Sequence, residues 1–257
     1  MRATTRNTAC CTVACILQPI ALFASLPERE RTALEARCRH LTIPGQAYLY
    51  HEGQSGDAVY VLVRGRIGIW SGGERGEPVL LAILGPGEMF GEMAILSNER
   101  VRTATAQALS KVEVIQILRT DIEALRQRFP RISDVFIEAL LRLVQRLTTQ
   151  VSELSELDGS TRLYRQLWRL GDVFEKRRAG AELPISQQQL ASMTGVGLRI
   201  TNRVLNEARL EGTLETGKKR IVVNDWAMVR RRAGLRFRNG GQTGLQRDTP
   251  SVGWDSP

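Results

Sequence analysis

The chain has 257 residues, which is enough for two modest domains that each bury a core of their own. Hydrophobic residues make up 42% of it, which excludes a disordered chain, and no run of about 18 apolar residues indicates a membrane span. The apolar stretch Cys10–Leu26 is interrupted by Gln18 and Pro19, so we do not expect a secretory signal.

The cysteines gather at the amino-terminal end of the chain. They are Cys10, Cys11, Cys15 and Cys38, and none follows in the rest of the sequence. This placement gives no disulfide framework and fits a reducing compartment. We therefore expect a cytoplasmic protein.

Positive charge is concentrated in one segment. Residues 1–159 carry 18 basic and 18 acidic side chains, whereas residues 160–238 carry 17 basic and 7 acidic ones, a net charge of +10. The tail 239–257 has a net charge of −1. Such clustering is typical of a domain that binds a polyanion, nucleic acid first. The alternative is a basic domain that is merely soluble.

The first half of the chain predicts many short strands after a short helical segment at about 20–40. Glycine-containing turns separate the strands, which favours an antiparallel sandwich or barrel. The expected strands are Val59–Val63, Ile67–Trp70, Val79–Leu84, Thr103–Ala106 and Val112–Ile117.

A long helical segment follows at about Asp121–Leu157, with a break or restart at Pro130. Its second half carries a heptad repeat, in which β-branched residues alternate with leucine, as in parallel two-stranded coiled coils. We expect a homodimer through this helix, and the alternative is a helix that packs on its own domain. The repeat consists of Ile137, Val144 and Val151 and, offset by three, of Leu140, Leu147 and Leu154.

The basic segment predicts a helix-turn-helix. Asp158-Gly159-Ser160 is a hinge, and a helix is expected at Arg162–Arg178. Ser186 and Gln189 form a capping box for a short helix at Gln187–Met193. After a turn at Thr194–Gly197, a second helix at about Leu198–Leu210 is expected to enter the major groove of DNA.

Two short strands, Leu214–Thr216 and Ile221–Val223, then flank a Gly-Lys turn and predict a wing whose cations meet phosphates. Gly212–Lys219 has the glycine spacing of a phosphate loop, but it lacks the Ser or Thr that would hold magnesium and follows a helix. We therefore do not expect an enzyme. The alternative for the arginines is a solvated helix face. The predicted DNA-contacting residues are Gln188, Arg199, Asn202, Arg203, Lys218, Lys219 and Arg220.

Four runs of residues resemble one family closely, and together with the helix-turn-helix they span about 20–230. They are Gly53–Asp57, Tyr60–Gly65, Phe90–Ala94 and Arg102–Ala104. On these runs the chain resembles the Crp/Fnr family of bacterial transcription regulators. The resemblance implies an α+β chain with a jelly-roll β-barrel of the cyclic-nucleotide-binding type, a dimerisation helix and a winged helix-turn-helix.

The domain boundaries that we predict follow from these segments. They are an extension at 1–19, the effector-sensing barrel at 20–130, the dimerisation helix at 131–158, the DNA-binding domain at 159–235 and a tail at 236–257.

The resemblance also implies an effector site at Phe90–Ala104, with no resident cofactor and with cAMP or another cyclic nucleotide as the candidate effector. Arg102 and Thr103 would bind the phosphate, Gly91 would let the backbone approach it, and Glu92 would accept from the ribose. Thr148 would reach the base. The neighbouring helix position holds Leu147 where cAMP-responsive members have a hydroxyl residue, so a scaffold without a nucleotide effector is the alternative, with Glu92 and Arg102 as a structural ion pair.

Other implied properties are a pseudo-palindromic operator on double-stranded DNA and contact with RNA polymerase. Leu198 and Arg199 stand where the family's commonest DNA-reading pattern has Arg and Glu, so a different operator is expected. The spacing of Cys10, Cys11 and Cys15 does not fit an iron–sulfur cluster, and His40 and His51 do not favour a haem.

Overall fold

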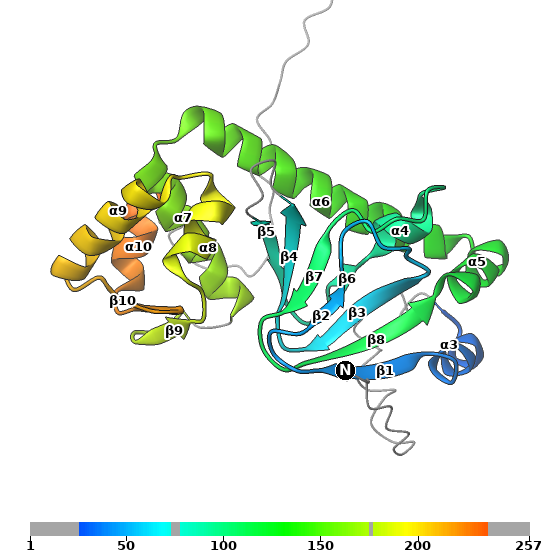
Figure 1. Cartoon of the computed structure of the whole chain (residues 1–257). Helices are drawn as coiled ribbons and strands as arrows, with labels where there is room; N and C mark the ends of the chain where they lie inside the picture. Colours follow the sequence, from blue (N-terminus) through cyan, green and yellow to red (C-terminus); the bar gives the residue numbers. More distant parts are fainter. Residues whose placement is uncertain (1–25, 73–77, 175–176, 236–257) are drawn as a thin grey trace, which may run out of the picture.

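The computed structural model describes residues 26–72, 78–174 and 177–235. The predicted extension at 1–19, the tail at 236–257 and Cys10, Cys11 and Cys15 lie outside the described residues. Within the described ranges the chain forms two lobes that are joined by one long helix (Figure 1).

The first lobe consists of two four-stranded antiparallel sheets, ordered β1-β8-β3-β6 and β2-β7-β4-β5. Alternating apolar side chains of the two sheets meet in a core that includes Tyr60, Leu62, Ile67 and Val114. This is the predicted jelly-roll. The strands are β1 Arg39–Ile43, β2 Tyr48–Tyr50, β3 Ala58–Arg64, β4 Ile67–Gly72, β5 Pro78–Leu84, β6 Met89–Phe90, β7 Thr105–Ala108 and β8 Val112–Leu118.

Four helices belong to this lobe or leave it. The short helices are α3 Glu28–Glu35, α4 Glu92–Leu96 and α5 Arg119–Arg128, and the long one is α6 Arg131–Glu156. Pro130 separates α5 from α6, as predicted, since proline has no N–H to continue a helix. The first turns of α6 pack on the barrel through Ile132, Val135 and Phe136, and the rest of α6 runs toward the second lobe (Figure 1).

The second lobe is a winged helix-turn-helix. Its helices are α7 Gly159–Val173, α8 Gln187–Thr194, α9 Leu198–Leu210 and α10 Trp226–Arg232, and its strands are β9 Ala181–Leu183, β10 Leu214–Gly217 and β11 Arg220–Val223. The strands form one sheet in the order β10-β11-β9. Gly217 pairs with Arg220, so the wing turns on Lys218 and Lys219.

Local sequence signals account for the boundaries in this lobe. Ser186 accepts from the backbone N–H of Gln189, and the Gln189 side chain accepts from the backbone of Ser186, which completes the predicted capping box. Gly195 ends α8 with φ +62°, a left-handed conformation that favours glycine. Asp158 caps α7 by accepting from Thr161.

The two lobes also meet away from α6. Leu80 and Ile83 of β5 are buried in the same apolar cluster as Leu167 and Leu170 of α7. Figure 1 shows β4 and β5 at the side of the barrel that faces α8. The sheet edge at β5 is therefore covered by the second lobe rather than by solvent.

Several elements differ from the sequence prediction. The sequence did not predict six of the elements, namely the strands β1, β2, β6 and β9 and the helices α4 and α10. Strand β7 begins two residues later than expected, and α7 ends at Val173 rather than at about Arg178. No described helix is long and apolar enough to cross a membrane.

Candidate functional sites

A cavity of about 740 Å³ opens between the barrel and α6. Residues from β5, β6, α4 and the segment that precedes β7 line one side, and α6 lines the other. Its walls combine apolar side chains with a few polar ones, as in small-molecule sites. The polar and charged side chains of the lining are Tyr50, Glu88, Glu92, Arg102, Thr103, Arg142, Arg146 and Gln150.

Arg102 lies at the base of this cavity and is 4% exposed. Its guanidinium donates to the carbonyl oxygens of Gly91 at 2.9 Å and of Ala58 at 2.8 Å. It also lies over the ring of Tyr50, with the guanidinium carbon 4.2 Å from the ring centroid. These contacts fix a positive charge in a place that water scarcely reaches, where an anion is bound most strongly.

Gly91 gives Arg102 the room for this position. Its φ of +78° lies in the left-handed region, and a Cβ there would come within 2.5 Å of Arg102 Nη1. Gly91 precedes α4, so the turn that the glycine permits also sets where Glu92 begins the helix.

Glu92 and Thr103 belong to the effector site that was predicted at Phe90–Ala104, and both line the cavity. Burial raises the pKa of the Glu92 carboxyl, and Arg102 and Arg146 oppose this shift. Thr103 Oγ1 donates to Met93 Sδ at 3.6 Å. Glu92 and Arg102 do not form the ion pair that was expected for a scaffold without a nucleotide effector, since Arg102 donates to backbone carbonyls instead.

The α6 wall carries two cations that the sequence reasoning did not single out. Arg142 pairs with Glu138 at 2.8 Å, and Arg146 pairs with Glu88 at 3.2 Å. Their spacing of four residues places them on one helix face, but it does not indicate that this face meets the barrel. Leu147 lines the cavity, whereas Thr148 is exposed and lies outside the lining.

A stripe of large apolar side chains on α6 faces solvent. Its members are between 50% and 62% exposed, and they follow the predicted heptad except that Leu140 is half-buried and Leu141 is exposed in addition. An exposed apolar stripe of this length indicates a covering partner. The stripe consists of Ile137, Leu141, Val144, Leu147, Val151 and Leu154.

On the second lobe, α9 presents a polar outer face. Thr201, Val204, Leu205 and Ala208 form its buried face. The predicted contact residues Arg199, Asn202 and Arg203 are all exposed, and their side chains form no hydrogen bond or ion pair with any described residue. Their donors are therefore available to an outside partner.

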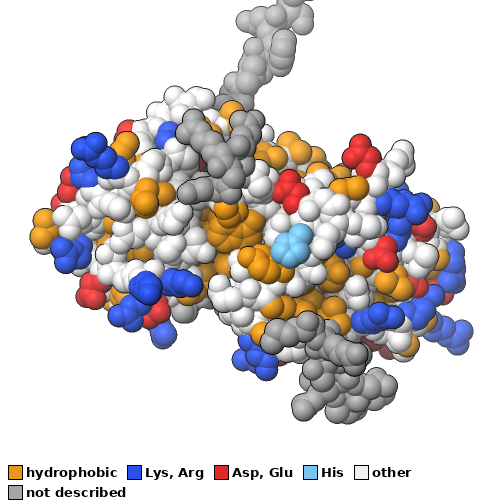
Figure 2. Space-filling view, viewed as in Figure 1, with side chains coloured by type: hydrophobic (Ala, Val, Ile, Leu, Met, Phe, Trp, Pro, Cys, Tyr) orange, Lys and Arg blue, Asp and Glu red, His pale blue; other side chains and the backbone are white. Residues whose placement is uncertain are grey.

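The wing adds further positive charge. Lys218 and Lys219 are exposed at its turn, and Arg220 pairs with Glu182 at 3.6 Å on the surface. Gln188 is exposed near the start of α8. Figure 2 shows Lys and Arg side chains at the left end of the molecule, over α9 and the strands of the wing, and a second group at the right end, over the first lobe.

Many other arginines of this lobe have structural roles. Arg165 and Arg169 pair with Glu153, Arg177 with Asp172, and Arg232 with Glu211. The net charge of the segment therefore overstates the charge available to a ligand. Arg199 and Arg203 on α9 and Lys218 and Lys219 at the wing are exposed and have no ion-pair partner among the described residues.

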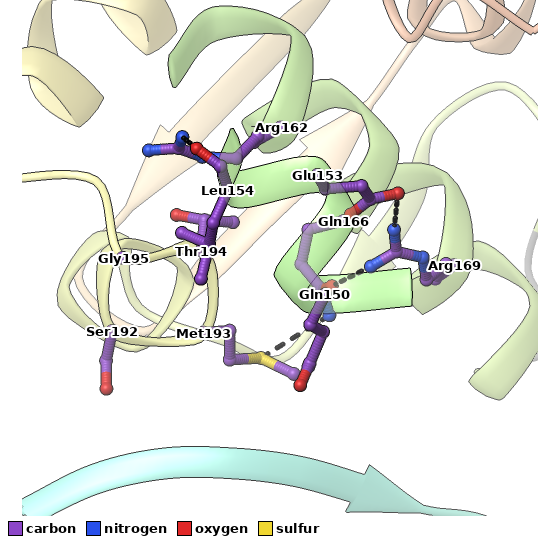
Figure 3. A pocket seen from close by; sticks show the side chains of 10 residues that line it. All are labelled: Gln150, Glu153, Leu154, Arg162, Gln166, Arg169, Ser192, Met193, Thr194 and Gly195. Carbon is purple, nitrogen blue, oxygen red and sulfur yellow. Dashed lines mark hydrogen bonds and ion pairs between the residues drawn. The ribbon is translucent and has the colours of Figure 1, made fainter. Parts of the chain in front are cut away.

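The junction of the two lobes contains a second, small cavity of about 190 Å³ between α6, α7 and α8. Figure 3 shows Glu153 of α6 bonded to Arg169 of α7, and Arg162 turned back to the carbonyl of Leu154. Glu153 is 7% exposed. These contacts join the end of α6 to the first helix of the second lobe.

The described residues hold no cluster of three His, Cys, Asp or Glu side chains with the geometry of a metal site. Cys38 is a free thiol, and burial raises its pKa to about 12, which makes it unreactive.

Comparison with known proteins assigns each lobe. A family model for the cyclic nucleotide-binding domain matches residues 40–129, and one for the Crp-like helix-turn-helix domain matches residues 161–232. These ranges correspond to the strands and α5 of the first lobe and to the winged helix.

Curated relatives match over most of the chain. The CRP-like cAMP-activated global transcriptional regulator of Mycobacterium tuberculosis is 25% identical over 221 residues, which cover 85% of this chain and 98% of the relative. The cyclic AMP receptor protein of Thermus thermophilus is 29% identical over 209 residues, covering 81% and 94%. The solved structure of the c-di-GMP-responsive global regulator CLP of Xanthomonas campestris has a TM-score of 0.65 at 22% identity and covers 77% of this chain and 100% of that one.

The two domains thus follow one another in the matched order, and the chain shares its fold with the solved regulator, which confirms the predicted fold. Both domain models match in sequence order, and α9, the recognition helix of the helix-turn-helix, carries cations without an ion-pair partner. The chain is therefore a member of the Crp/Fnr family of DNA-binding transcription regulators.

Proposed function

We propose that the chain acts in the cytoplasm as a homodimer without catalytic activity, and that a cyclic nucleotide in the barrel cavity modulates its binding to a pseudo-palindromic operator. In this proposal the DNA-bound dimer contacts RNA polymerase. The observation that carries the proposal is the buried guanidinium of Arg102 at the base of a cavity that also touches α6.

The cavity supports an anionic ligand with one polar end. Arg102 and Thr103 would bind a phosphate, and Glu92 would accept from a sugar hydroxyl. The apolar walls at Leu84 and Leu143 would hold a base. The two curated relatives are named for cAMP, which makes a cyclic mononucleotide the first ligand to test.

Strand β5 supports a link between this cavity and the DNA-binding lobe. Leu81 and Leu84 line the cavity, whereas Leu80 and Ile83 are buried against the second lobe. The pairing of β5 with β4 shifts register between Ile69 and Trp70, so the alternation along β5 is interrupted at Leu81 and the two pairs lie on opposite faces of the strand. A ligand that shifts β5 would therefore also shift what packs on its other face. The effector would change the affinity for DNA by the factor by which its own affinity differs between the two arrangements of β5 and the second lobe.

The exposed stripe on α6 supports a homodimer. A second copy that packs stripe against stripe would bury six large apolar side chains, and it would place two recognition helices for half-sites about 10 bp apart. Thr148 stays a predicted ligand-binding residue. It adjoins Leu147 at the side that the second copy would cover.

One observation favours a second candidate, the same DNA-binding scaffold without a nucleotide effector. The Nη1 and Nη2 groups of Arg102 already donate to Gly91 and Ala58, and Tyr50 stacks on its guanidinium. An effector would have to add to these bonds or replace them.

Isothermal titration of the full-length protein with cAMP and cGMP separates the two candidates, and cyclic di-GMP serves as a third titrant. We expect micromolar binding that Arg102→Ala abolishes and that Arg64→Ala, which removes an exposed arginine of β3, leaves unchanged. Circular dichroism of each variant checks that the fold is intact, and Glu92→Gln provides a second weakening variant. The absence of heat with all three nucleotides would favour the scaffold without a nucleotide effector.

A further inference from the structure

Helix α9 begins with an apolar residue that its own lobe does not bury. Leu198 is 45% exposed and does not belong to the apolar core of the second lobe. The core-facing side of α9 is formed by residues further along, from Thr201 to Ala208. The position of Leu198 is therefore not explained by packing within this chain.

Leu198 lies among the predicted base-reading residues. On a helix, residues four apart are neighbours, so Leu198 adjoins Asn202, and the parallel row next to them contains Arg199 and Arg203. These three polar residues are exposed and without partners in the described chain. An apolar group thus stands beside hydrogen-bond donors on one surface.

Two other exposed apolar residues of α9 differ from Leu198. Ile200 lies toward the start of α7, since a Cβ on Gly159 would come within 4.0 Å of its Cγ2. Leu210 is 76% exposed but ends the helix, about 18 Å along the axis from Leu198. Of the three exposed apolar residues of α9, Leu198 is therefore the one whose place in the first turn has no explanation within the chain. The first turn of the second helix of a helix-turn-helix faces the major groove.

We propose that Leu198 is a specificity-determining residue that reads thymine through its C5-methyl group. Leucine has no donor or acceptor, and the thymine methyl is the apolar group that a base edge presents in the major groove. The inference depends on the proposed binding of DNA by α9. It predicts a T·A pair in each half-site next to the bases that Arg199 and Asn202 contact.

The test begins with selection of tight sites from a random double-stranded library by the full-length protein, with the candidate nucleotides present and absent. Each thymine of the selected half-site is then replaced by uracil, which removes only the methyl group. We expect one thymine at which uracil weakens binding about fourfold per half-site, the size expected for one methyl group withdrawn from an apolar contact.

The same titrations with Leu198→Ala assign the effect. In this variant uracil and thymine at that position should bind equally, whereas Leu210→Ala should keep the full difference. Uracil sensitivity that persists in Leu198→Ala, or no sensitive thymine in a tightly bound site, would overturn the inference while leaving the DNA-binding function intact. Failure to select any site would count against the proposed function itself.

Discussion

The backbone N–H of Leu80 in β5 donates to Ser192 Oγ of α8 at 2.9 Å, and this bond joins two residues that are 112 positions apart. In Figure 3, Ser192 points toward the strand below α8. The bond satisfies a donor on the edge strand of the barrel sheet, and it connects a wall of the cavity between the barrel and α6 to the first helix of the helix-turn-helix.

Ser192→Ala should weaken this contact. The change leaves the N–H of the fully buried Leu80 without an acceptor, which costs about 1–3 kcal/mol. Urea unfolding measures the loss, and faster hydrogen exchange at Leu80 locates it. Ser155→Ala, an exposed serine of α6, is the matched control and should change stability by less than about 0.5 kcal/mol. Equal stabilities of the two variants would show that the contact is weak in solution.

Glu153→Gln should loosen the joint between α6 and α7. Glu153 is buried and bonded to Arg165 and Arg169, so the neutral amide leaves two partly exposed arginines without their counter-charge, at a cost of about 2–3 kcal/mol. Thermal unfolding measures this loss of stability. Glu156→Gln, three residues further on and exposed, should have no such effect. Equal thermal stability of the two variants would contradict a structural role for the contacts of Glu153 with Arg165 and Arg169.

Glu92 should make stability depend on pH. Burial raises its folded-state pKa above the unfolded value, so the folded chain holds this proton more strongly. The stability that the folded chain gains from this stronger proton binding is fully present below the unfolded pKa of about 4.3, and it is lost as the pH rises through the folded pKa. Urea unfolding between pH 4 and about 7 should show that the free energy of unfolding declines more steeply with pH for the wild type than for Glu92→Gln. Parallel curves would mean that Glu92 is better solvated than its position suggests.

Arg203→Ala and Lys218→Ala should weaken DNA binding in different ways. The first removes a base-reading candidate on α9, so it should cost about 1–3 kcal/mol and relax specificity at one position of each half-site. The second removes a cation of the wing, so it should weaken all sequences alike and lower the salt slope by about 1. Fluorescence anisotropy with a site and its single-base variants separates the two patterns. A uniform loss for Arg203→Ala would contradict base contact.

Much of the second lobe could be predicted because its signals are local. Ser186, Gln189 and Gly195 fix α8 through bonds within a few residues, and α9 follows with the predicted bounds. The helix break at Pro130 and the heptad on α6 are equally local. Elements without such signals were not predicted. The strand β1 shows little apolar alternation, and α4 has five residues, too few for a helical pattern.

The long-range features could not be predicted from the sequence. The bond between Leu80 and Ser192 depends on how the lobes meet, and nothing near either residue indicates it. The family resemblance drew attention to Arg102, but its bonds to Gly91 and Ala58 follow from three segments that the fold brings together. Arg142 and Arg146 line the cavity because α6 crosses it, which the helical pattern alone does not indicate.

The central claim is that the cavity and the recognition helices are coupled, and linked titrations test it most directly. The dissociation constant for the selected DNA site is measured with and without the nucleotide, and that for the nucleotide with and without DNA. We predict that each ligand changes the affinity for the other by the same factor, between about 5-fold and 150-fold, as thermodynamic linkage requires. A nucleotide that binds the wild type and leaves the affinity for DNA unchanged would contradict the account.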